Sequence, residues 1–203
     1  MTAILDAVAS GKIAGEVMAV ISNRPDAMGL AIAADRGIAT VSIDHRAHPD
    51  REAFEGALIA SIDAHAPELV VLAGFMRILS TAFVERYRGR MINIHPSLLP
   101  TYPGLDTHRR ALADGVRIHG CTVHFVTGDV DHGPIIAQAA VPVKNDDDAV
   151  SLATRVLMAE HQILVSAVGW FCAGRLVIDG ARVRVISERV DLSPQIVPAP
   201  DLS

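Results

Sequence analysis

Short apolar runs alternate with amphipathic stretches through the first half of the sequence, and this alternation constrains the fold more than any other feature. Residues 17–22, 39–43 and 69–74 read as strands, and the first and last of these runs are apolar enough to be buried on both faces. Between the last two runs, Phe54, Leu58 and Ile62 repeat at helical spacing up to a break at Pro67. Alternation of this kind predicts parallel β-α-β units and an α/β fold with helices on both faces of a mostly parallel central sheet.

The same patterns continue along the rest of the chain. The sequence opens inside a helix that stops at Gly11, and further helices are expected near residues 27–36, 81–87 and 105–114. A short strand is expected at residues 91–94, and two longer apolar stretches at 120–126 and 134–143 could extend the sheet in mixed orientation. A long helix should begin after Asp148 as its N-cap, and a small hairpin should turn at Asp179-Gly180.

Composition narrows the class of protein. The 203 residues are 50% hydrophobic and 20% charged, which excludes a disordered chain, and no apolar run reaches the roughly 18 residues of a membrane span. We expect one domain over residues 1–190 and a loose, proline-containing tail over 191–203. The net charge is −5 and the basic residues are scattered, so small molecules are expected as partners rather than nucleic acid or membrane.

Cysteine usage and the N-terminus bear on the location of the protein. Cys121 and Cys172 are the only cysteines, and they are not in a metal-binding spacing. No basic segment followed by an apolar stretch opens the sequence. These features predict a cytoplasmic protein without a disulfide framework.

Asn93 and His95 are the first candidates for chemistry. They stand two residues apart at the end of a predicted strand, so their side chains leave the same face. An amide donor beside an imidazole suits the polarisation of a carbonyl oxygen and the stabilisation of an oxyanion. The alternative is that both side chains only satisfy backbone groups of the following loop. The ends of strands in open α/β sheets are where ligands bind, which favours the first interpretation.

Asp131 lies in a polar loop between the two longer apolar stretches. A carboxylate close to His95 would hold the tautomer of the imidazole and favour its charged form. A solvated turn residue before Gly133-Pro134 is the other interpretation, and the sequence leaves both open.

Two further charged residues fall among apolar neighbours. Glu160 shares a helical stripe with Val156 and Leu164, so it should point inward and meet either a ligand hydroxyl or an internal polar partner. Arg77 follows the predicted strand at 69–74, at the edge of the sheet where ligands bind, or else simply reaches solvent. No group of His, Cys, Asp or Glu has a metal-ligand spacing: His119 and His124 are five apart, on opposite faces of a strand-like run.

Several motifs together carry a resemblance. The segments Leu72-Ala-Gly-Phe-Met-Arg-Ile-Leu-Ser80, Asn93-Ile-His-Pro-Ser-Leu-Leu-Pro100, Tyr102-Pro-Gly-Leu-Asp-Thr-His108, His119-Gly-Cys-Thr-Val-His-Phe-Val126 and Asp131-His-Gly-Pro-Ile135 resemble those of phosphoribosylglycinamide formyltransferases, the folate-dependent enzymes of purine synthesis. The resemblance runs from Met1 to about Ile186. It implies a Rossmann-like formyltransferase fold. It also implies transfer of a formyl group from 10-formyltetrahydrofolate, as co-substrate, to the amine of glycinamide ribonucleotide.

The resemblance also implies roles for individual residues. Asn93 would donate to the formyl oxygen, His95 would stabilise the oxyanion, and Asp131 would orient His95 and help to move the proton. Residues matching the folate pocket are Arg51, Met76, Arg77, Ile78, Leu79, Val126, Thr127 and Asp129. Glu160 and Pro96 match the site of the nucleotide substrate, where Glu160 would hold the ribose hydroxyls. No metal is implied, and the protein would be a monomer or a homodimer.

Family members start with a short strand and a Gly-x-Gly-Ser-Asn loop that binds the substrate phosphate, and the sequence printed here starts after that loop. The first strand would lie between residues 17–22 and 69–74, so we expect it to be missing from the sheet of this chain. Two other interpretations remain open at this point. One is formyl transfer to a different amine acceptor, and the other is a truncated, non-catalytic folate-binding product.

Overall fold

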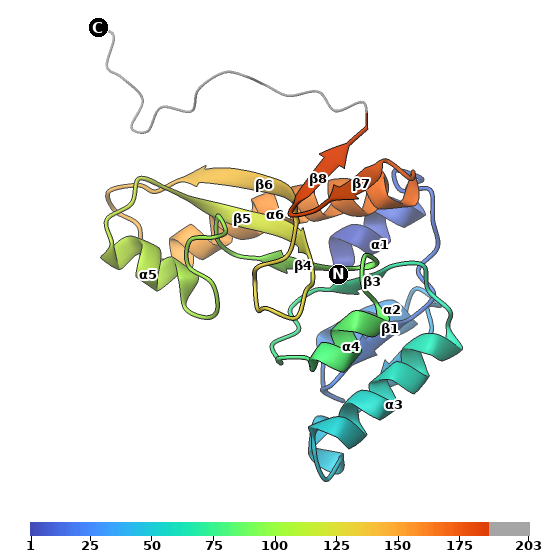
Figure 1. The fold of residues 1–203 in the computed structure, drawn as a ribbon. Helices are drawn as coiled ribbons and strands as arrows, with labels where there is room; N and C mark the ends of the chain where they lie inside the picture. Colours follow the sequence, from blue (N-terminus) through green and yellow to red (C-terminus); the bar gives the residue numbers. More distant parts are fainter. Residues whose placement is uncertain (187–203) are drawn as a thin grey trace, which may run out of the picture.

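The computed structural model describes residues 1–186, and its elements follow the order expected from the sequence (Figure 1). The helices are α1 (Thr2–Ala9), α2 (Met28–Ala34), the short 3-10 helix η1 (His45–Ala47), α3 (Arg51–Ala64), α4 (Thr81–Arg86), α5 (Thr107–Ala113) and α6 (Ala149–Cys172). The strands are β1 (Val20–Ser22), β2 (Thr40–Ser42), β3 (Val70–Leu72), β4 (Met91–His95), β5 (Ile118–Phe125), β6 (Ile135–Pro142), β7 (Leu176–Asp179) and β8 (Arg182–Val185).

Three α-helices begin where a side-chain oxygen accepts from the first turn. Asp50 accepts from the Ala53 amide at the start of α3, and Ser80 accepts from the Phe83 amide at the start of α4. Asp148 is the N-cap of α6, as predicted, and it forms a reciprocal capping box with Ser151. These caps satisfy backbone donors that have no partner within the helix.

The strands form two sheets. β1 pairs in parallel with β2, whereas the larger sheet has the order β3-β4-β5-β6-β8-β7. In the larger sheet β3 runs parallel to β4 and β6 parallel to β8, but the β4–β5, β5–β6 and β7–β8 pairs are antiparallel. The expectation of a mostly parallel sheet was therefore wrong, although the mixed orientation of the two long strands and the hairpin at Asp179-Gly180 are confirmed. β1–β2 and β3–β4 are each joined through a helix, as parallel neighbours usually are, whereas β5 and β6 are joined by a shorter loop that allows an antiparallel pair. β4 and β5 are joined through α5 and are nevertheless antiparallel.

β1 and β3 are not paired with each other in the part of the chain that the structure describes. Each is therefore an edge of its own sheet, at the two places between which the sequence predicted a missing strand. All three residues of each strand are only partly buried, so the prediction that both strands are buried on both faces was wrong. A free edge leaves one side of each strand without a neighbouring strand to cover it.

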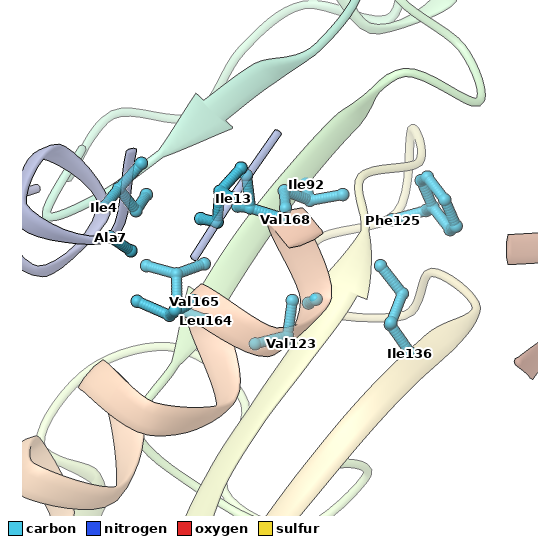
Figure 2. Packing of buried hydrophobic residues seen from close by; sticks show 11 residues of the cluster. Ile4, Ala7, Ile13, Ile92, Val123, Phe125, Ile136, Leu164, Val165 and Val168 are labelled. Atoms are coloured by element: carbon cyan, nitrogen blue, oxygen red, sulfur yellow. The ribbon is translucent and has the colours of Figure 1, made fainter. Parts of the chain in front are cut away.

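Neighbouring residues of β4 pack into two different hydrophobic clusters, one on each face of the strand. Ile92 packs with α1 and α6 on one face, and Met91 packs with α3 and α4 on the other. Figure 2 shows Ile4 and Ala7 of α1 and Leu164, Val165 and Val168 of α6 gathered against strand residues of the first core. Helices therefore cover both faces of β4, as expected for an α/β fold, and the end of β4 is fixed from both sides.

The predicted tail at 191–203 lies outside the described residues, and the single domain over 1–190 stays a prediction. Within residues 1–186, no helix is long and apolar enough to cross a membrane.

Candidate active site

The last residues of β4 carry the two side chains that the sequence singled out first. Asn93 and His95 occupy β4 two residues apart, and they pair across the antiparallel ladder with His124 and Thr122 of β5. His95 is only 5% exposed. Because strand side chains alternate between faces, the two polar groups share one face, as predicted.

The loop between β5 and β6 brings Asp131 to His95. Oδ2 of Asp131 lies 3.4 Å from Nδ1 of His95, and both side chains are almost fully buried. The same oxygen accepts from the backbone amide of Gly104 at 2.8 Å. The predicted pairing of Asp131 with His95 is therefore present, and Asp131 is not a solvated turn residue.

The backbone around Asp131 holds it in this place. Asp131 itself has a positive φ of 57°, an uncommon conformation for a residue other than glycine. Two residues later, a Cβ on Gly133 would lie 1.6 Å from the carbonyl oxygen of Phe125, so only glycine fits. The loop that carries Asp131 is thereby packed closely against the end of β5.

His95 faces an acceptor on each side of its ring. Its Nε2 lies 2.9 Å from the carbonyl oxygen of Tyr102, which can only accept, and its Nδ1 faces the Asp131 carboxylate. In either tautomer of the ring, one nitrogen carries a hydrogen that can donate to the acceptor facing it. The His95 imidazole is therefore held from both sides at the end of β4.

Residues of β5 and β6 anchor the loop that follows β4. The buried Thr122 hydroxyl donates to the carbonyl of Ser97 at 2.7 Å and accepts from the amide of Leu99 at 3.0 Å. Gln138 donates to the Leu99 carbonyl at 2.9 Å.

α5 adds a further anchor to the same loop, because the hydroxyl of Thr107, its first residue, donates to the carbonyl of Pro96 at 2.7 Å. The Tyr102 carbonyl and the Gly104 amide, which contact the catalytic candidates, thus belong to a fixed loop.

His124 is the site residue that sequence reasoning missed. It is 2% exposed, its Nε2 lies 3.3 Å from Nδ2 of Asn93, and the same nitrogen is 3.9 Å from Oδ1 of Asp131. The spacing of His124 from His119 indicates only that the two histidines do not form a metal site. The signal that would have found it is the antiparallel register of β4 with β5, which sets Asn93 opposite His124.

The expected folate residues gather on two neighbouring loops. Met76 and Ile78, in the loop between β3 and α4, are 73% and 67% exposed. The loop after β5 approaches the start of α4, since a Cβ on Gly128 would lie 3.7 Å from the Thr81 methyl group. Exposed apolar surface beside the Asn93–His95–Asp131 group suits a flat, partly apolar ligand.

The remaining folate candidates lie around these loops. Arg77 stacks over the ring of Phe54 with its Cζ 5.5 Å from the centroid, while Leu79 and Val126 pack into the core beneath. Thr127 donates to the carbonyl of Asp129 at 3.3 Å within the β5–β6 loop. Arg51 is the first residue of α3, and its Nε is 3.9 Å from Glu55.

Glu160 is the charged residue of α6 that matches the site of the nucleotide substrate. It is half-buried on α6, and burial raises the pKa of its carboxyl group, partly offset by the amino group of Met1. Within residues 1–186 it forms no hydrogen bond or ion pair with Asn93, His95 or Asp131. Pro96 directly follows His95 and is held through its carbonyl.

The described residues contain no group of three or more His, Cys, Asp or Glu side chains that could hold a metal ion. Cys121 is buried and Cys172 exposed, and neither forms a disulfide.

The chain matches known proteins over most of its length. The family model described as Formyl transferase matches residues 1–168. Phosphoribosylglycinamide formyltransferase of Escherichia coli (strain K12) is 53% identical over 176 residues, which are 87% of this chain and 83% of that protein. The human trifunctional purine biosynthetic protein adenosine-3 is 42% identical over 86% of this chain, which spans 17% of that larger protein.

The fold is also similar to that of a solved structure with a related name. Glycinamide ribonucleotide transformylase 1 from Symbiobacterium toebii superposes with a TM-score of 0.89 and 48% sequence identity, covering 91% of this chain and 87% of that one. The matched region contains β4 and the loops that meet at Asp131. The chain therefore belongs to the formyl transferase family, and within it to the phosphoribosylglycinamide formyltransferases.

Proposed function

We propose that the chain transfers a formyl group from 10-formyltetrahydrofolate to the amine of glycinamide ribonucleotide through Asn93, His95 and Asp131. This is the activity of a phosphoribosylglycinamide formyltransferase, an enzyme of de novo purine biosynthesis. The observation that carries the residue assignment is the convergence of an amide, an imidazole and a carboxylate at the end of β4, with His95 and Asp131 3.4 Å apart.

The reaction begins with attack of the glycinamide amine on the formyl carbon. The carbonyl electrons move to the formyl oxygen, and Asn93 Nδ2 donates a hydrogen bond to the oxyanion. His95, held between Asp131 and the Tyr102 carbonyl, stabilises the developing oxyanion as a donor. Both groups are fixed before the substrate arrives, so they need little reorganisation as negative charge develops.

The tetrahedral intermediate then collapses. The attacking nitrogen loses a proton, the bond from the formyl carbon to N10 of the folate breaks, and N10 takes up a proton. Asp131, directly or through a water molecule, transfers the proton between these two nitrogens. The products are formylglycinamide ribonucleotide and tetrahydrofolate, and no metal ion takes part in the proposed steps.

The surrounding residues bind the two substrates. The apolar side chains of Met76, Ile78 and Leu79, with the 126–131 loop, enclose the folate ring system. Arg51 faces the carboxylates of the glutamate tail. Glu160 accepts hydrogen bonds from the ribose hydroxyls of the nucleotide, a role suited to a half-buried carboxylate among apolar neighbours.

Purified protein tests this assignment in a formyl-transfer assay with glycinamide ribonucleotide, a sugar-nucleotide amine and methionyl-tRNA as alternative acceptors. We expect turnover with glycinamide ribonucleotide to exceed that with the other two. Asn93→Ala and His95→Ala should each lower kcat by about 10²-fold or more while folate binding is retained, because an oxyanion donor acts mainly in the transition state. Near-normal turnover in either variant contradicts the assignment.

Matched controls exclude a general effect of side-chain removal. Asn145→Ala removes an exposed side-chain amide whose oxygen accepts a hydrogen bond from Arg117. His65→Ala removes the histidine that follows the last residue of α3. Both should keep kcat within about twofold, as surface changes outside a site usually do.

A further inference from the structure

His124 is buried beside the catalytic candidates without a role in the proposed reaction. It lies on β5 directly opposite Asn93, and Nε2 of its ring is 3.3 Å from Nδ2 of the Asn93 amide. On the other side of the ring, Nδ1 lies 2.9 Å from the carbonyl oxygen of Phe125. Each ring nitrogen thus has one partner.

The partner of Nδ1 fixes the tautomer of the ring. A carbonyl oxygen can only accept, so Nδ1 must carry the proton, and Nε2 of the neutral ring is then an acceptor. An acceptor at Nε2 selects one orientation of the Asn93 amide, with its NH2 group toward His124. The reverse orientation would set the amide oxygen against a nitrogen lone pair.

The orientation decides what Asn93 can offer a substrate. An NH2 group has two hydrogens, so one is held by Nε2 of His124 and the second is free to donate. Two other charged or titratable groups act on the His124 ring, namely Asp131, whose Oδ1 is 3.9 Å from Nε2, and His95. Burial lowers the pKa of His124, and so does the nearby His95, while the Phe125 carbonyl and Asp131 act in the opposite direction.

We propose that His124 is a positioning residue for formyl transfer: as a neutral ring protonated at Nδ1, it holds the Asn93 amide with its N–H donor toward the formyl oxygen. This inference rests on the proposed role of Asn93. A neutral His124 also leaves the Asp131 carboxylate to His95. Protonation of His124 would replace the acceptor at Nε2 with a donor, release Asn93 and compete for Asp131.

The tautomer is measured directly by ¹⁵N NMR of the full chain labelled at histidine, with the His124 signals identified by their loss in His124→Gln. At neutral pH we expect a ring protonated at Nδ1 only. A ring protonated at Nε2, or at both nitrogens, overturns the proposal whatever the activity of the enzyme.

Two substitutions each keep one of the two hydrogen bonds of His124 and remove the other. In His124→Gln the amide oxygen can still accept from Asn93, whereas in His124→Asn the amide can still donate to Phe125 but cannot reach Asn93. We expect His124→Asn to lower kcat about tenfold with KM changed less than about threefold, and His124→Gln to restore most of kcat. Equal kcat in the two variants, both folded by their melting curves, overturns the proposal.

A double-mutant cycle separates this inference from the proposed function. In an Asn93→Ala background, His124→Asn should lower kcat no further, because the group that it positions is gone. If Asn93→Ala itself leaves kcat unchanged, the catalytic assignment fails. If Asn93→Ala lowers kcat but His124→Asn lowers it equally with and without Asn93, the positioning role fails and the catalytic assignment stands.

Discussion

The backbone amide of Gly104 donates to Oδ2 of Asp131 at 2.8 Å. This contact joins the loop after β4 to the loop after β5, and it does so at the carboxylate that faces His95. Asp131 therefore has two separable tasks: it supplies a negative charge to His95, and it holds two loops together.

Substitution of Asp131 by asparagine or alanine separates these tasks. An asparagine keeps an oxygen that can accept from Gly104 but loses the charge, whereas an alanine loses both. We expect kcat to fall about 10²-fold in both variants, and the melting temperature to fall only in Asp131→Ala, which loses the hydrogen bond from Gly104 that joins the two loops, worth about 0.5–1.5 kcal/mol. Activity assays and thermal melts on the two purified variants test this, and wild-type kcat in Asp131→Asn would remove the ion pair from the mechanism.

A methyl group at Gly133 should displace the loop that carries Asp131. Gly133→Ala places Cβ against the Phe125 carbonyl, so the loop that carries Asp131 must shift, at a cost of about 1–3 kcal/mol. We expect a lower melting temperature together with a loss of kcat. Gly56→Ala in α3 is the matched control, because a Cβ there meets nothing within 4 Å, and it should be neutral or slightly stabilising. Equal behaviour of the two variants would show that Gly133 is not required.

The order of the elements was predictable because apolar periodicity is a local property. The repeat of Phe54, Leu58 and Ile62 identified α3, and Asp148 identified the start of α6. Strand orientation was not predictable in the same way. β5 is almost completely buried, as the strands of parallel sheets usually are, yet it is antiparallel to both neighbours, so burial on both faces does not reveal the orientation of a strand.

The same distinction between local and long-range properties applies to the residues of the site. Asn93 and His95 share a face because of their spacing of two, which the sequence contains in full. The approach of Asp131 and the position of His124 depend on the register between β4 and β5, a long-range property. Spacing within β5 suggested only that His119 and His124 do not form a metal site.

Glu160→Gln tests the predicted nucleotide contact. The glutamine keeps the size of the side chain but removes a charged acceptor, so we expect KM for glycinamide ribonucleotide to rise about tenfold, the value of a hydrogen bond to a charged group. The KM for 10-formyltetrahydrofolate should not change. Glu85→Gln, which removes an exposed partner of Arg88, is the control and should alter neither KM. A rise in the folate KM alone would place Glu160 elsewhere.

Arg51→Ala tests the predicted contact with the glutamate tail. Loss of an exposed cation should raise KM for a polyglutamylated folate more than for a folate without the glutamate, with kcat unchanged. Arg88→Ala removes an arginine that pairs with Glu85 on the surface of α4 and its C-terminal turn, and it serves as the matched control. An equal effect on both folates would exclude the contact.

His119 should make the protein sensitive to acid. It is buried, and its Nε2 lies 3.2 Å from Nδ1 of His108. Burial, with His108 next, lowers the pKa of His119 to about 4 from an ordinary 6.5, so the unfolded chain binds the proton more readily than the folded one. The stabilisation is complete above about pH 6.5 and is lost as the pH falls from there to about 4, by roughly 3 kcal/mol.

Denaturant unfolding across this range measures the effect. His119→Leu has no proton to bind, so its free energy of unfolding should fall less steeply with acid than that of the wild type. His65→Leu, at a histidine outside this pair, should keep the wild-type slope. An unchanged slope in His119→Leu would assign the acid sensitivity to other groups.

The separation of β1 and β2 from the larger sheet has a consequence for amide hydrogen exchange. In residues 1–186 no main-chain hydrogen bond joins the two sheets, and Ile21 and Val41 couple to the rest only by packing against the core around α3 and α4. The β1–β2 pair can therefore open as a unit of its own while β4 and β5, bonded on both edges, stay closed. Its amides should exchange with solvent through local opening, and those of β4 and β5 only when the whole domain unfolds.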